Sequence, residues 1–256
     1  MKKIWFCVVS VIVLFISCYE INEDIVINDN GTGTYSTRMD MSALIQMMQT
    51  MMDEEELAKS GLKRSIDTLI RLKSVLDTAK NVSDEEKRLF SDGTLNLQLD
   101  MEKSVFKTNM QLPFKSLNDL QKIMMGSGNN TMGSVFREVF SQKDSAQNPA
   151  APKNDGFDQI NNIYDVKITR HEISRSLNKQ RYDSVMSKPE IMQAKQMAGG
   201  GVEILFTTTI RLPSKVKKVD NAELIKLSDD KKTVTIRYDI MKLLDTPDKF
   251  SYKIEY

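Results

Sequence analysis

The chain has 256 residues and a nearly balanced charge, with 36 lysines and arginines against 35 aspartates and glutamates. A chain without excess positive charge has no electrostatic basis for binding nucleic acid, so we expect no nucleic-acid partner. The length suits one large domain or two small ones, and it is sufficient to bury a hydrophobic core.

The first seventeen residues have the organisation of a secretory signal peptide. Two lysines follow Met1, and an uncharged, mostly apolar run extends from Ile4 to Ile16. A run of this length is typical of a signal peptide and is shorter than the roughly 20 residues that a membrane-spanning helix needs. We therefore predict that residues 1–17 are removed, and we favour this over an uncleaved membrane anchor.

The residues around Cys18 indicate how this segment is cut. An ordinary secretory site has small residues at the last and third-last positions before the cut. Ser17 satisfies this requirement and Phe15 does not. A large apolar residue followed by a small residue and a cysteine resembles the bacterial lipobox, with Phe15 in place of the usual leucine. We therefore predict that Cys18 is lipidated, because two acyl chains anchor a protein stably where one is marginal.

Few residues are left for catalysis or metal binding. Cys7 lies in the leader and Cys18 at the cut, so the predicted mature chain has no thiol for a disulfide, a nucleophile or a metal cluster. His171 is the only histidine, and a zinc site or a serine triad would depend on it alone. We interpret His171 as a strand-surface residue and predict no enzyme activity, metal or cofactor, although a pair of catalytic carboxylates stays open.

The first half of the mature chain alternates between strand and helix patterns. We expect residues 18–24 to form a lipidated tether and 25–256 a single α+β domain. A turn at 29–31 between two alternating segments predicts a β-hairpin. Apolar residues at three- and four-residue spacing predict helices over 42–57 and 62–80, and strict alternation predicts strands over 95–101 and 106–112.

The second half continues this pattern. Ser116 is expected to cap a helix that ends at Met124. The other elements expected from spacing are a helix at 135–140, a flexible loop at 141–156, a strand at 164–168, a helix at 179–197 broken at Pro189, and strands at 202–212, 234–238 and 250–256. Together these elements predict an α+β fold, with an antiparallel sheet of about seven to eight strands and amphipathic helices covering one face.

Several segments resemble those of a known group of proteins. They are Leu212–Val219, Ala222–Leu224 and Ser228–Thr235, together with the hairpin Asn30–Tyr35 that leads into a methionine-rich helix. They are similar to the uncharacterised bacteroidete-type cell-envelope lipoproteins. The resemblance implies an envelope lipoprotein and assigns no active-site residue. We therefore expect the lipid bilayer to be a partner through acylated Cys18, and we expect the outer membrane as the location, with the periplasmic or surface side left open.

Three functions are compatible with these patterns. The first is a non-enzymatic structural or interaction module that holds protein partners at the membrane. The second is a carrier of lipid or another apolar small molecule. The third and weakest is Cu(I) binding by thioethers, for which the chain offers Met39, Met41, Met47, Met48, Met51 and Met52. Methionine fills irregular gaps in hydrophobic cores, so we favour a plain core role for most of these residues.

Overall fold

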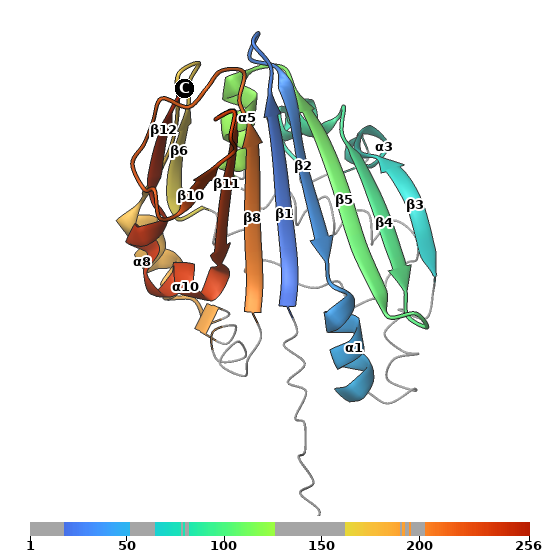
Figure 1. The fold of residues 1–256 in the computed structure, drawn as a ribbon. Helices are drawn as coiled ribbons and strands as arrows, with labels where there is room; N and C mark the ends of the chain where they lie inside the picture. The colour runs from blue at the N-terminus through green and yellow to red at the C-terminus, as the bar shows by residue number, and fades with distance from the viewer. Residues whose placement is uncertain are drawn as a thin grey trace, which may run out of the picture.

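Two β-sheets form the framework of the protein. The computed structural model describes residues 18–51, 65–77, 79, 82–125, 162–189, 191–192, 195 and 203–256. An eight-stranded sheet has the order β10-β11-β8-β1-β2-β5-β4-β3, and a four-stranded sheet has the order β6-β7-β12-β9. The smaller sheet and helix α5 lie on the same side of the larger sheet, behind it in Figure 1. The fold is therefore of the mixed α+β class.

The elements have the following bounds. The large sheet consists of β1 (Cys18–Ile27), β2 (Gly33–Asp40), β3 (Ile66–Arg71), β4 (Thr94–Asp100), β5 (Val105–Phe114), β8 (Glu203–Arg211), β10 (Ile225–Leu227) and β11 (Thr233–Asp239). The small sheet consists of β6 (Tyr164–Ile168), β7 (Glu172–Leu177), β9 (Lys218–Val219) and β12 (Tyr252–Glu255). The helices are α1 (Ser42–Met51), α3 (Leu72–Leu76), α4 (Asp84–Phe90), α5 (Leu117–Met124), α8 (Lys179–Met186), α10 (Ile240–Asp245) and the 3-10 helix η1 (Pro247–Phe250).

The strongest alternating patterns in the sequence correspond to strands. The expected hairpins are confirmed as β1–β2 and β4–β5, and both pairs are antiparallel. The predicted cap of α5 is also confirmed, because the Ser116 side chain accepts a hydrogen bond from the backbone N–H of Asp119. These elements depend on neighbouring residues in the chain, which is why local spacing identifies them.

The predicted tether is instead part of a central strand. β1 begins at Cys18 and pairs along its length with β2 and with β8, so residues 18–24 belong to the sheet. The three acids of this segment suggested a solvated tether. In the strand, Glu20 and Asp24 share one face and Glu23 lies on the other. The pairing of β1 with β8 is parallel, so the large sheet is mixed and not purely antiparallel as expected.

The helix predicted over residues 62–80 is largely wrong. Residues 66–71 form β3, and only Leu72–Leu76 are helical. Ile66, Thr68 and Ile70 are less exposed than the residues between them, which is the two-residue period of a strand. Ile66 and Ile70 are also four residues apart, so the same residues satisfied the helical template. The predicted leader at 1–17, helix at 135–140 and loop at 141–156 lie outside the described residues.

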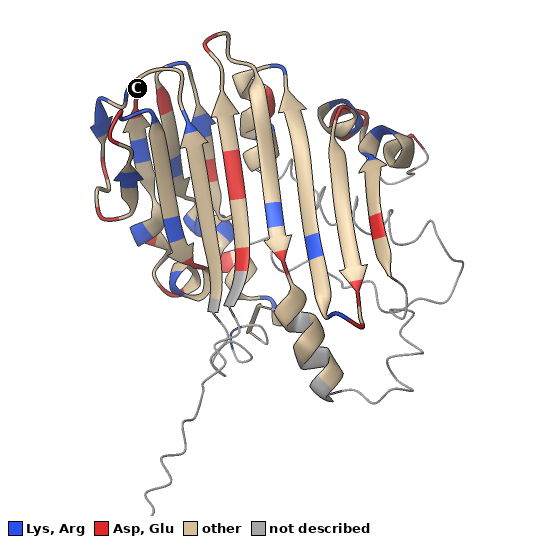
Figure 2. Ribbon diagram, turned by 45° about the vertical axis from the view of Figure 1, so that its right-hand side comes forward, with Lys and Arg blue, Asp and Glu red and all other residues tan. Residues whose placement is uncertain are grey.

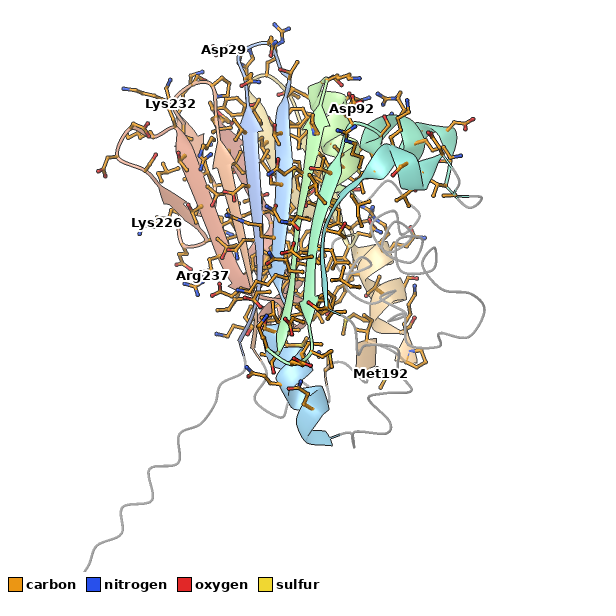
Figure 3. The ribbon with its side chains drawn as sticks, turned by 90° about the vertical axis from the view of Figure 1, so that its right-hand side faces the viewer. Asp29, Asp92, Met192, Lys226, Lys232 and Arg237 are labelled. Atoms are coloured by element: carbon orange, nitrogen blue, oxygen red, sulfur yellow. The ribbon has the colours of Figure 1, made fainter. Side chains whose placement is uncertain are left out.

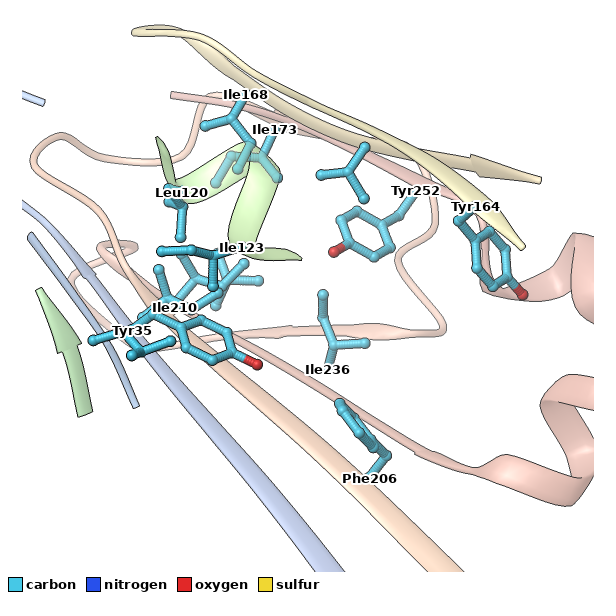
Figure 4. Close-up of a cluster of buried hydrophobic side chains, with 14 of the residues drawn as sticks. Tyr35, Leu120, Ile123, Tyr164, Ile168, Ile173, Phe206, Ile210, Ile236 and Tyr252 are labelled. Atoms are coloured by element: carbon cyan, nitrogen blue, oxygen red, sulfur yellow. The ribbon is translucent and has the colours of Figure 1, made fainter. Parts of the chain in front are cut away.

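The hydrophobic core lies between the two sheets. Figure 4 shows Tyr164, Ile173 and Tyr252 of the small sheet facing Phe206 and Ile236 of the large sheet. Helix α5 contributes further apolar side chains to the same cluster. One part of the layer over the inner face is thus a second sheet, which the alternation pattern did not predict.

Candidate functional site

The outer face of the large sheet, opposite the small sheet, is the one turned toward the viewer in Figure 1. Side chains alternate between the two faces of a strand, and the strand registers align the outward residues in rows across the sheet. One row runs Arg237, Thr207, Asn22, Arg38, Asn109, Asn96 and Leu69. The next row includes Glu20, Asp40, Lys107, Gln98 and Asp67. Arg237 projects away from the side of the sheet that carries α8 in Figure 3.

A groove of about 540 Å³ lies on this face, where the two rows cross β1, β2, β5 and β4. Four strands spaced at the usual separation span roughly 14 Å, which is long enough for an extended ligand. The residues that line the groove with their side chains are Glu20, Asn22, Arg38, Asp40, Asn96, Gln98, Lys107 and Asn109. Met39 and Thr108 border it as well, although alternation directs their side chains to the inner face. We refer to it as the outer groove.

The charges of the outer groove balance. Glu20 and Asp40 contribute two carboxylates, and Arg38 and Lys107 contribute two cations. Lys107 Nζ lies 3.1 Å from Asp40 Oδ2, and Arg38 pairs with Asp24 beside the groove. Burial raises the pKa of Asp40, but hydrogen bonds from Ser42 and Lys107 outweigh this effect and lower it overall. The mixture of signs on the central strands is visible in Figure 2, and it gives the groove no preference for a charged ligand.

Three amides in the groove have unused hydrogen-bonding capacity. The Oδ1 atom of Asn109 is buried and has no hydrogen-bond partner. Within the described part of the chain, the side chains of Asn22 and Asn96 also make no hydrogen bond. Buried polar groups in proteins are nearly always satisfied, so an unpaired acceptor inside a groove needs an explanation.

A second polar cluster lies on the inner face of the large sheet. The carboxylate of Glu23 accepts hydrogen bonds from the hydroxyls of Tyr35, at 2.5 Å, and Thr208, at 2.9 Å. Burial raises the pKa of Glu23, and the two hydrogen bonds and the charge of Arg175 only partly offset this rise. Glu23 is therefore anchored by the residues of neighbouring strands.

Arg175 of β7 enters the same interior from the small sheet and is only 8% exposed. Its guanidinium carbon lies 3.9 Å from the ring centre of Tyr164, and its Nη1 donates to the Tyr238 hydroxyl at 3.2 Å. Burial raises the pKa of Tyr238 and of Tyr252, the latter to about 12, so both rings are neutral near pH 7. Arg175 thus joins the two sheets through its contact with Tyr238 of β11, while its stacking on Tyr164 lies within the small sheet.

The two clusters differ in how well their polar groups are satisfied. Inside the protein, Glu23 and Arg175 have partners from the chain itself, as expected for groups that stabilise a fold. On the outer face, the side chains of Asn22 and Asn96 and the Oδ1 atom of Asn109 have no partner among the described residues. We therefore take the outer groove as the candidate functional site.

The residues singled out from the sequence are distributed over the molecule. Cys18 is the first residue of β1 and pairs with Glu203 of β8, two residues before groove residue Glu20. His171 is exposed in the turn between β6 and β7 and not within a strand. Met39 borders the outer groove with its side chain on the inner side of β2, and Met41 lies just beyond β2. The side chains of Met47, Met48, Met51 and Met52 lie outside the described residues.

The described ranges lack clustered metal ligands and long apolar helices. They contain no group of three or more histidine, cysteine, aspartate or glutamate side chains placed to hold a metal ion. None of the helices in these ranges combines the length and apolarity required to cross a bilayer.

Sequence patterns alone did not identify the groove amides as a site. Asn96, Gln98 and Asn109 were recognised only as the solvated side of two strands. A usable signal was present, because asparagine is depleted in β-strands and here occurs in three of four adjacent strands, β1, β5 and β4. That Asn22, Asn109 and Asn96 form one row depends on the pairing of β1, β2, β5 and β4, which no local pattern reveals.

Comparison with known proteins gives no match to a protein-family model, to a curated protein or to a solved structure. Function is therefore inferred from the residues of the chain itself.

Proposed function

We propose that the protein is a lipid-anchored module of the bacterial cell envelope that binds a partner through its outer groove and catalyses no reaction. The observation that supports this most directly is the outer groove itself, with its unpaired amides on an otherwise regular sheet. A rigid sheet is a suitable platform for recognition because its backbone holds side chains at fixed spacing.

The position of Cys18 is compatible with an anchor. The strand begins at the predicted lipidation site, and Glu20 already lines the groove. A lipid on Cys18 would hold the groove close to the bilayer surface, at the end of the sheet where β1 starts. Two acyl chains give enough buried methylene groups for stable attachment.

Metabolic labelling tests the anchor. Cells that express the full chain are grown with an alkyne fatty acid, and the wild type is compared with Cys18→Ser. We expect the wild type to be labelled and shortened, and the Cys18→Ser variant to remain unlabelled and at precursor length. Equal labelling of both proteins would rule out a lipid on this residue.

Photo-crosslinking in intact cells tests the groove as the binding surface. A photoreactive amino acid replaces Asn96 in the groove or, as a control, exposed Lys167 of the small sheet. We expect a discrete cross-linked product from position 96 and none from position 167. If position 96 gives no product above the control, binding does not occur through the groove.

The polar groups of the inner face argue against the alternative that the protein carries a lipid or another apolar molecule. Thr37, Thr108 and Thr208 are buried there, and Glu23 lies among them. These polar groups interrupt the apolar surface that an acyl chain requires. We also propose that helices complete the cover over the inner face, because α5 already lies there beside the small sheet. Mass spectrometry of gently purified protein would contradict our preference if it revealed a stoichiometric lipid beyond the acyl chains of Cys18.

A further inference from the structure

We propose that the outer groove binds a neutral oligosaccharide that carries hydroxyl and acetamido groups. This inference rests on the proposed function, in which the groove is the binding surface, and it names the chemical class of the ligand. The feature that carries it is the row Asn22, Arg38, Asn109 and Asn96 across four adjacent strands.

The asparagines of this row lower the stability of the fold. Asparagine is disfavoured in strands, whereas threonine is favoured. The neighbouring strands of the same face use threonine, at Thr207, Thr209 and Thr235. A row of three asparagines therefore lowers stability without a compensating hydrogen bond among the described residues. Residues that go against the strand preference of their position and do not stabilise the fold are expected at functional sites.

The chemistry of the row matches a polar ligand without charge. Each amide offers two donors and one acceptor, which complement a hydroxyl or an acetamido group. The two carboxylates and two cations of the groove cancel, and Lys107 and Arg38 are already paired with Asp40 and Asp24. An anionic ligand would have to break one of these pairs, and the balanced charge of the lining gives a cation no net attraction, so a neutral ligand is favoured.

The row ends in an exposed apolar side chain. Leu69 of β3 pairs with Asn96 of β4 and is 68% exposed, one of the most exposed large apolar side chains of the described chain. A sugar ring has one apolar face formed by its C–H groups, and Leu69 can pack against that face. The amides would then bind the hydroxyl and acetamido edges of the same chain of sugars.

Calorimetric titration of the lipidated mature protein in nanodiscs tests this proposal. The probe is a tetramer of N-acetylglucosamine, and a sulfated oligosaccharide of similar length is the charged control. We expect saturable binding of the neutral tetramer and weaker binding of the sulfated probe. Co-sedimentation with an insoluble polymer of the same sugar distinguishes a wall polymer from a free oligosaccharide as the natural source. Tighter binding of the sulfated probe, or binding of neither neutral probe, would overturn the proposal.

Two variants separate recognition from folding. Asn109→Val and Asn96→Thr should each weaken tetramer binding about tenfold, the effect of leaving one polar group of the ligand unpaired. Both should melt at the same temperature as the wild type or higher, because each replaces an asparagine by a residue with a higher preference for strands. Thr235→Val, on the same face but outside the groove, should leave binding unchanged. Unchanged affinity in both asparagine variants would refute the amide row as the site.

The two proposals fail in different ways. If position 96 cross-links in cells but no neutral sugar binds, the groove remains the interaction surface and the sugar class is wrong. If neither result is obtained, the groove itself is wrong.

Discussion

Glu23 is a carboxylate on the inner face of a sheet, and its surroundings determine how stability depends on pH. Burial raises its pKa above the ordinary value of 4.5, so the folded state holds the proton more tightly than the unfolded state. The stability that this preference provides is complete below the unfolded pKa and is lost as pH rises through the folded pKa. The hydrogen bonds from Tyr35 and Thr208 reduce this loss without abolishing it.

Replacing Glu23 with glutamine should remove this dependence. We expect the urea midpoint of Glu23→Gln, relative to that of the wild type, to increase between about pH 4 and about pH 8. Glu172→Gln is the control of opposite sign, because a hydrogen bond from Lys253 lowers the pKa of Glu172. Its midpoint relative to wild type should decrease as pH rises through the lowered folded pKa toward about pH 5, and stay constant above that. A difference for Glu23→Gln that is constant with pH would contradict the raised pKa.

Arg175 provides a second test at the residue scale. Lysine keeps the positive charge but lacks the planar group that stacks on Tyr164 and donates to Tyr238. We expect Arg175→Lys to lower the free energy of unfolding by about 1–3 kcal/mol, the sum of a buried cation–π contact and a hydrogen bond. Exposed Arg237→Lys should change it by less than about 0.5 kcal/mol. Equal effects of the two variants in urea unfolding would show that Arg175 does not join the sheets.

At the scale of elements, the close approach of β1, β2 and β5 depends on Gly33. A Cβ atom at this position would lie 1.9 Å from the carbonyl oxygen of Val26 and 2.4 Å from Cζ of Phe114. The backbone oxygen cannot move without disturbing the β1–β2 ladder, so the hairpin would have to open. Gly33→Ala should therefore destabilise the protein by about 3 kcal/mol or more. Thermal melting of Gly33→Ala beside Thr34→Ala checks this prediction, and the control substitution should cost less than about 1 kcal/mol. Similar melting temperatures of the two variants would disprove the steric argument.

The elements also show what sequence patterns can and cannot supply. β4 and β5 were predictable because Leu95, Leu97 and Leu99 alternate strictly with polar residues and the partner strand follows directly. The parallel pairing of β1 with β8 joins residues about 185 positions apart, as between Glu23 and Thr208, and has no local signature. The division into two sheets was missed for the same reason. The groove depends on this long-range pairing, so its residues could be listed as solvated but not assembled into a site.

At the scale of the whole molecule, the start of β1 at Cys18 determines how the protein would stand on a membrane. β1 has ten residues and so spans roughly 30 Å from the anchor end to the opposite end of the sheet. Asp29 lies at the far end, as Figure 3 shows, and Glu102 lies in the β4–β5 turn at the anchor end. A lipid on Cys18, as proposed, would be attached directly to the first residue of the strand, so these two positions should differ in their distance from the bilayer.

Quenching by lipids that carry a nitroxide on their headgroup would measure this difference. The predicted mature chain has Cys18 as its only cysteine, and its thiol is blocked by the lipid, so Asp29→Cys and Glu102→Cys can each be labelled with a fluorophore at a single site. In reconstituted vesicles we expect strong quenching at position 102 and little at position 29, because the effect is short-ranged compared with the length of the sheet. Removal of the headgroup nitroxide is the control and should restore the fluorescence of position 102. Equal quenching at both positions would mean that the sheet lies flat on the membrane or rotates freely about Cys18. In that case the strand that begins at the anchor does not set the height of the outer groove above the lipid.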